Sequence, residues 1–225
     1  MSDLLHSLLL SLRIALAATG VIALVGVPVA YVLARHRFIG RSIVETILTV
    51  PLVLPPTVVG YGLMLLFGTR GLLGSIFQRI SGEPFVFSET SAIVAAVVVA
   101  MPLLLLPARA AFAAVEPEFE QIAQLFGAGA LQVFWHVNLP LARRGVASGL
   151  LLAFARSLGE FGATMMVFGA QEDRLTLPIS VYQDFVANNF RHAAPALVLL
   201  TTVSLIVIAV YNRWPGGIPG TSRPK

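Results

Sequence analysis

The stretch Glu120-Gln-Ile-Ala-Gln-Leu-Phe-Gly127, followed twelve residues later by Leu139-Pro140, lies between two apolar runs that are each long enough to cross a bilayer. It is short and amphipathic, and Gly127 ends its apolar pattern. The apolar side of such a helix needs a surface to receive it, which is either the lipid headgroups or a second protein. Charge and spacing elsewhere in the chain bear on that choice.

The composition is typical of a membrane protein. Only 12% of the 225 residues are charged, 57% are hydrophobic and the mean hydropathy is +0.86, whereas a soluble domain carries about 25% charged residues. The sequence has no cysteine, which excludes disulfides, thiolate metal sites and cysteine nucleophiles. The four histidines are too scattered for metal ligation, so we expect no metal and no cofactor.

Five apolar runs reach the roughly 20 residues that a membrane-crossing helix needs. They lie at about 8–34, 44–68, 91–115, 145–169 and 193–212. The connecting segments are short, so the sequence predicts an all-α integral membrane protein with one domain over residues 1–225. We interpret the first run as a retained span and not a signal peptide, because its start carries Asp3, without an early Lys or Arg, and the run extends to Ala34.

Lys and Arg are unevenly distributed between the two sides of these spans. Four lie on one side: Arg70, Arg79, Arg174 and Arg191. Nine lie on the other: Arg35, Arg37, Arg41, Arg109, Arg143, Arg144, Arg213, Arg223 and Lys225. Because the richer side is cytoplasmic, we expect the amino terminus outside, and the carboxyl terminus and segment 116–140 inside. The net charge of +4 then reflects topology, and we expect no nucleic-acid partner.

Three prolines interrupt the second run, at Pro51, Pro55 and Pro56. Each removes a backbone donor and clashes with the preceding turn, so the helix must kink or break there. Broken helix at membrane depth survives where protein or a water-lined cavity satisfies the freed carbonyls. These prolines are therefore candidates for a gate or pathway wall, and the alternative is a kink that only shapes helix packing.

The segment between the third and fourth runs predicts a helix from Pro117 to Phe126. Its apolar residues recur with the helical spacing i, i+3, i+4, i+7. They are Phe119, Ile122, Ala123 and Phe126. Three glutamates occupy its first turn, where they favour the helix dipole. We expect a second short helix through Leu131, Phe134 and Trp135 that ends before Pro140.

This amphipathic hairpin can lie on lipid headgroups or dock on a soluble subunit. The first helix carries three Glu and no Lys or Arg, and anionic headgroups would repel it. We therefore favour a protein partner.

At these residues the sequence resembles the permeases of the smaller type of ABC importer. Their cytoplasmic loop reads Glu-Ala-Ala, three residues, Gly, nine residues, Ile, one residue, Leu-Pro. The matching string is Gln121-Ile122-Ala123, Gly127, Val137 and Leu139-Pro140, with two substitutions, at Gln121 and Ile122. The resemblance implies the type I importer architecture and a coupling helix that docks on an ATP-hydrolysing subunit. It implies coupling roles for Phe119, Gln121, Ile122, Ala123, Phe126, Gly127, Leu139 and Pro140.

Two further strings resemble the molybdate permease subunit: Val50-Pro-Leu-Val-Leu-Pro-Pro-Thr-Val-Val-Gly60 and Phe154-Ala-Arg-Ser-Leu-Gly-Glu-Phe-Gly-Ala163. So does Arg70-Gly-Leu-Leu-Gly74. Sulfate and tungstate permeases share a string like Gly159–Gly162, so that part indicates only a tetrahedral oxyanion. The resemblance implies a homodimer with two ATPase subunits, an external oxyanion-binding protein, and a bacterial or archaeal inner membrane.

The chain itself lacks the residue that a P-loop requires. That motif needs a lysine to reach the nucleotide phosphates, and the sole lysine is Lys225. We therefore expect no enzymatic activity in this chain and place ATP hydrolysis in a partner.

Three ionisable side chains fall inside apolar runs, where charge is costly and usually functional. Arg13 lies near the outer end of the first run and is expected to reach the interface. Arg156 and Glu160 are four residues apart and share a helix face. They form either part of an anion pathway or a buried pair that holds helices in register. Gly145 and Gly149 predict a close helix approach.

Two other function classes remain open at this point. An ion-driven secondary transporter would carry inverted repeats with paired broken helices, and only the second run is clearly broken by its sequence. An intramembrane enzyme would need a catalytic group, but Ser157 and Glu160 have no His or Asp in an apolar run to complete one.

Overall fold

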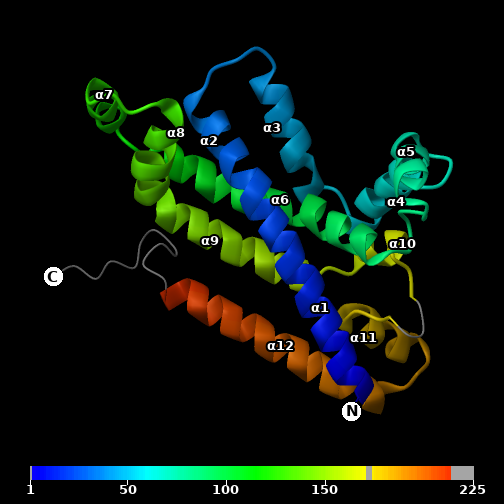
Figure 1. The fold of residues 1–225 in the computed structure, drawn as a ribbon. Coiled ribbons are helices and arrows are strands. Elements are labelled where there is room, and N and C mark those ends of the chain that lie inside the picture. The colour runs from blue at the N-terminus through cyan, green and yellow to red at the C-terminus, as the bar shows by residue number, and fades with distance from the viewer. Residues whose placement is uncertain (1, 171–173, 214–225) are drawn as a thin grey trace.

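The computed structural model describes residues 2–170 and 174–213, and every regular element in these two ranges is a helix. Arg223 and Lys225, which the charge count placed on the cytoplasmic side, lie outside these ranges. In Figure 1, α7 (Pro117–Leu125) lies at the same end of the molecule as the turn between α2 and α3.

The described residues contain three helices that are long and apolar enough to cross a membrane. The first is continuous through α1 (Ser2–Val21), η1 (Ile22–Gly26) and α2 (Val27–Arg35). The others are α6 (Glu89–Ala113) and α12 (Phe190–Arg213). A fourth span results if the bent pair formed by the second run counts as one. The number five therefore stays a prediction.

The second run is broken, as its prolines predict. It forms α3 (Arg41–Thr49), η2 (Val50–Leu52) and α4 (Pro56–Phe67), and the two α-helices are bent by 118°. Pro51 lies in η2, Pro55 is the N-cap of α4 and Pro56 is its first residue. The prolines thus end one helix and begin the next, since a missing N–H costs nothing at a helix start.

The prediction of a single helix at 145–169 is wrong. The chain instead forms α9 (Leu139–Leu158) and a separate short α10 (Gly162–Val167). Gly159 ends α9, and the Glu160 carboxylate accepts a hydrogen bond from the backbone N–H of Ala163, which starts α10. α9 carries three arginines and is not one of the three candidate spans. The second and fourth runs are therefore both broken.

The second short helix does not end before Pro140. It continues as α8 (Ala130–Val133), η3 (Phe134–Asn138) and α9 without interruption. η3 is a π turn, in which the Leu139 N–H donates to the Phe134 carbonyl oxygen five residues back. The wider turn accommodates a proline ring that would clash with the carbonyl four residues before it. The π turn η1 stands at the same distance before Pro28.

The core is built on close contact between α6 and α9, which run side by side (Figure 1). A Cβ at Gly149 would lie 3.0 Å from the Leu104 Cα, and one at Gly145 would lie 2.9 Å from the Pro107 carbonyl oxygen. The predicted role of these glycines in close packing is confirmed. In α6, 56% of the most apolar 18-residue stretch is buried inside the protein. In α12 the corresponding share is 6%, so most of its surface is exposed.

Two further short helices are α5 (Leu72–Ser81) and α11 (Leu177–Val186). The string Arg70-Gly-Leu-Leu-Gly74 forms the corner between α4 and α5. A Cβ at Gly74 would overlap the carbonyl oxygens of Phe67 and Gly68, so this corner requires glycine.

Candidate functional site

The predicted coupling helix is present as α7. It ends in a Schellman motif, in which the Ala128 N–H donates to the Ala123 carbonyl oxygen at 3.0 Å and the Gly127 N–H donates to that of Gln124 at 2.9 Å. Gly127 has φ +85°, a conformation that favours glycine. The first-turn glutamates Glu118 and Glu120 lie at the positive end of the helix dipole.

All nine residues of α7 are described, and none of them is buried. Phe119 and Ile122 are about half exposed, and Phe126 is 90% exposed. Leu125, which the predicted stripe omits, is 86% exposed. Gln121 is also exposed and Ala123 is half-buried. An acidic helix that leaves its large apolar side chains uncovered is typical of a protein-docking surface.

The remaining coupling candidates lie apart from this surface. Leu139 is half-buried against the core and Pro140 is exposed, and both stand at the start of α9. Trp135 is 55% exposed, whereas Phe134 is buried in the core. The predicted coupling residues therefore fall into two groups, one in α7 and its C-terminal turn and one at the start of α9.

A buried arginine attaches α7 to the first span. Arg35 Nε lies 2.8 Å from Glu120 Oε1, and Arg35 Nη2 donates to the Val115 carbonyl oxygen at 2.7 Å and to Asn138 Oδ1 at 3.4 Å. The side chains of Arg35 and Glu120 are 13% and 21% exposed, and Asn138 is fully buried. The position of Glu120 in the sequence indicates only a role in the helix dipole. In the structure it also forms an ion pair with Arg35 and is largely shielded from solvent.

Three aromatic rings pack together beside the last turn of α2. Tyr31 packs edge-on against Phe134 and Phe112, with centroids 4.9 and 5.5 Å apart. Phe112 is fully buried and belongs to the main core with Phe134. These aromatic residues form part of the tightly packed core next to the Arg35 contacts. Sequence reasoning used Arg35 only for topology, because a contact across 85 positions leaves no local pattern.

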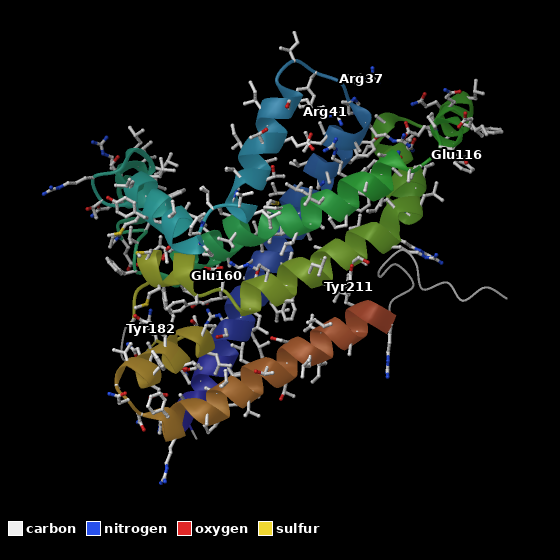
Figure 2. The ribbon with its side chains drawn as sticks, turned by 180° about the vertical axis from the view of Figure 1, so that it is seen from behind. Arg37, Arg41, Glu116, Glu160, Tyr182 and Tyr211 are labelled. Atoms are coloured by element: carbon white, nitrogen blue, oxygen red, sulfur yellow. The ribbon has the colours of Figure 1, made fainter. Side chains whose placement is uncertain are left out.

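Of the gate candidates, Pro56 lies where α4 crosses α10, and Glu160 lies just before α10. A Cβ at Gly60 would lie 2.7 Å from the Ala163 Cα, and one at Gly162 would lie 3.0 Å from the Pro56 Cβ. The two strings that carry the molybdate-permease resemblance are therefore packed against each other. Figure 2 shows Glu160 at this crossing, far from Arg37, Arg41 and Glu116 at the other end.

Arg156 and Glu160 form the predicted ion pair, with Nη1 and Oε2 2.6 Å apart. Their side chains are 30% and 2% exposed. Glu160 Oε1 also accepts from the Ala163 N–H at 2.7 Å. Both carboxylate oxygens are thus engaged within the protein, and only Arg156 keeps an open side.

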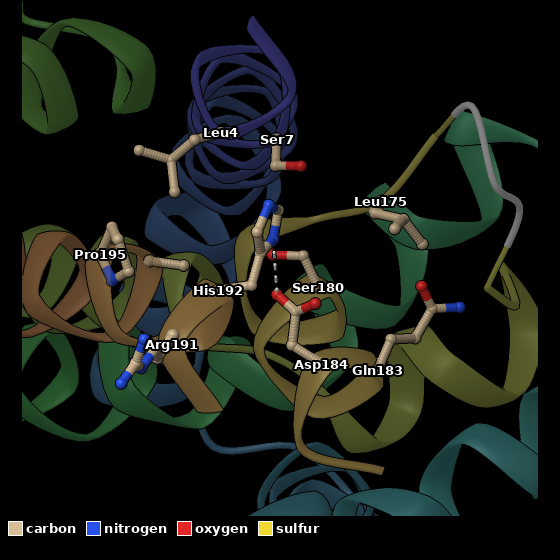
Figure 3. A pocket seen from close by; sticks show the side chains of 10 residues that line it. Leu4, Ser7, Leu175, Ser180, Gln183, Asp184, Arg191, His192 and Pro195 are labelled. Carbon is tan, nitrogen blue, oxygen red and sulfur yellow. Dashed lines mark ion pairs between the residues drawn. The ribbon is translucent and has the colours of Figure 1, made fainter. Parts of the chain in front are cut away.

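Near the amino terminus, a hollow of about 260 Å³ lies between α1, α11 and α12 (Figure 3). His192 Nδ1 lies 3.5 Å from Asp184 Oδ2 on its wall, and Arg191 also lines it. Arg13 is 74% exposed and lies 3.1 Å from Glu89 Oε1 at the start of α6. This end of the molecule therefore carries charges of both signs.

Residues 26–214 match the family described as "Binding-protein-dependent transport system inner membrane component". A molybdenum transport system permease protein of Mycobacterium tuberculosis is 39% identical over 94% of this chain and 80% of its own. One from Escherichia coli is 35% identical over 93% and 92%. A sulfate transport system permease protein of Synechocystis is 34% identical over 90% and 77%.

Among solved structures, the inward-facing MetNI methionine ABC transporter has a similar fold. It gives a TM-score of 0.71 over 95% of this chain and 94% of its own, at 18% identity. The chain therefore belongs to the family of inner membrane components of binding-protein-dependent transport systems.

Proposed function

We propose that this chain is the membrane-spanning subunit of an ATP-driven molybdate importer, with its amino terminus outside and α7 in the cytoplasm. The observation that carries the coupling role is α7, a helix with none of its residues buried and with exposed apolar side chains. Relatives named for molybdenum transport support the substrate. An ATPase subunit would receive Phe119, Ile122 and Phe126, and hydrolyse ATP in place of this chain.

The same proposal assigns a path for the movement. Displacement of α7 reaches α9 through α8 and η3, a continuous helix from Ala130 to Leu158 that spans roughly 40 Å at about 1.5 Å per residue. α9 ends at Gly159, beside the α4–α10 crossing. We propose this crossing, with Pro51, Pro55 and Pro56, as part of the gate. Glu160 there holds Arg156, whose open side faces the anion route.

A homodimer with two ATPase subunits is the proposed assembly. Only 6% of the most apolar 18-residue stretch of α12 is buried, which leaves an apolar face on which a second copy of the chain could pack. An extracytoplasmic oxyanion-binding protein would deliver the anion at the end formed by α5 and α11.

The test is uptake by the complex reconstituted in liposomes with its ATPase and binding protein. We expect molybdate uptake that stops on ATP depletion and persists when ion gradients are collapsed. The reverse pattern would support a secondary transporter, a class that the two broken runs α3–α4 and α9–α10 keep relevant. Competition with tungstate and sulfate would set the substrate range, and sulfate uptake that molybdate does not inhibit would contradict the molybdate assignment.

A further inference from the structure

α7 packs on η3 and α8, and it is joined to the rest of the molecule by the chain on both sides and by one ion pair. The chain joins it to α6 through Ala114–Glu116 and to α8 through Phe126–Gly129. The ion pair is that of Arg35 and Glu120, which reaches the last turn of the first span. Because α7 buries no residue of its own, this pair is the polar contact that fixes one side of it.

The arginine cluster is suited to rigid transmission. Arg35 forms an ion pair with Glu120, in which Nε lies 2.8 Å from Oε1, and its Nη2 donates a hydrogen bond to the Val115 carbonyl oxygen at 2.7 Å. A planar guanidinium fixes both acceptors relative to each other, which a single ammonium on a flexible stem does not do. With side chains only 13% and 21% exposed, the pair is weakly screened by salt.

We infer that Arg35 is a positioning residue that passes the displacement of α7 to the first span through its ion pair with Glu120. The inference rests on the proposed function, because it concerns how movement driven by the ATPase enters the membrane. α2 packs on α6, with Ala30 and Leu33 buried. Movement delivered to Arg35 therefore reaches the first and third spans together, in parallel with the path through α9.

A purely structural ion pair and a transmitting one predict different results for the double variant R35M/E120L. Replacing both partners with apolar residues leaves no unpaired buried charge, while the Val115 carbonyl oxygen and Asn138 Oδ1 each lose one donor, so the melting temperature of the variant is measured alongside its transport. We expect this variant to co-purify with the ATPase and to hydrolyse ATP as the wild type does. Molybdate uptake per ATP hydrolysed should fall about tenfold, within the range of allosteric couplings.

The matched control is R37Q, which removes the same charge from an exposed position two residues later. It should transport as the wild type does. R35M/E120L that assembles and transports as the wild type does would overturn the inference.

R35K provides a second, independent variant. It keeps the charge, but its ammonium does not hold the ion pair to Glu120 and the hydrogen bond to the Val115 carbonyl oxygen in one rigid plane. Uptake per ATP should therefore fall about threefold or more while assembly is kept. Unchanged uptake would overturn the inference, and so would loss of ATPase binding in both variants, because the pair would then only maintain the docking surface. A wild-type complex that hydrolyses ATP but imports no oxyanion would instead contradict the proposed function.

Discussion

Replacing Arg156 with Gln should destabilise the protein more than replacing Glu160 with Gln, although both changes break one ion pair. The two side chains lie 2.6 Å apart but differ in exposure, at 30% for Arg156 and 2% for Glu160. Without Arg156, a carboxylate stays buried without its counter-charge. Without Glu160, the guanidinium already has an open side, and its long stem lets the head move toward it.

The expected magnitudes follow from these exposures. Removing one partner of a buried pair costs about 3–5 kcal/mol. R156Q should lie near the lower end, at about 3 kcal/mol, because the Ala163 N–H still bonds Glu160 Oε1. E160Q keeps an acceptor for that N–H and leaves a partly open cation, so its cost should be about 1 kcal/mol. The difference of about 2 kcal/mol is roughly a 30-fold change in the unfolding equilibrium.

The assay is reversible unfolding in mixed detergent micelles, followed by circular dichroism. R144Q removes an exposed arginine from the same helix and should change the free energy of unfolding by less than about 0.5 kcal/mol. Equal costs for R156Q and E160Q would refute the reasoning from burial. A cost for R156Q as small as that for R144Q would show that the pair is not buried in the assembled protein.

Three further substitutions test the packing and the docking surface. Gly149→Ala should lower the melting temperature in detergent, because its Cβ would press on Leu104 at a cost of about 1–3 kcal/mol. Gly20→Ala has open space around its Cβ and should leave the melting temperature unchanged. Equal decreases in melting temperature for the two variants would contradict this packing. Gly127→Ala should cost about 1 kcal/mol in the same assay because its φ is +85°, and no loss would argue against the Schellman end of α7. Phe126→Ser should leave the melting temperature unchanged and reduce ATPase co-purification about tenfold, because a 90% exposed ring stabilises only the complex; undiminished co-purification would place docking elsewhere.

Local patterns were sufficient for the elements that depend on local chemistry. The i, i+3, i+4, i+7 spacing predicted α7, and Gly127 marked its end. The prolines predicted the break between α3 and α4, and Gly145 and Gly149 predicted the close approach of α9 to α6. In each case the deciding residues are neighbours in sequence, so periodicity and backbone restriction carry the information.

Tertiary contacts decided what the sequence did not predict. The apolar run continues past Leu158, so hydropathy alone extends the helix, but Glu160 binds the Ala163 N–H and starts a new one. Arg35 and Glu120 each had an adequate local explanation, as a topological charge and as a helix-dipole partner. Their pairing depends on how α2 and α7 are brought together, which no local spacing reports.

The π turn η3 also determines how α9 is rotated about its own axis. A turn closed five residues back holds one residue more than an α-turn, which rotates all that follows by about 100°. Deleting one residue between 134 and 138 would remove the extra residue and restore an ordinary helix that still faces Gly145 and Gly149 toward α6, whereas an α-turn formed by the undeleted chain would turn both glycines away. The twelve positions from Gly127 to Leu139 therefore set an angle as well as a length.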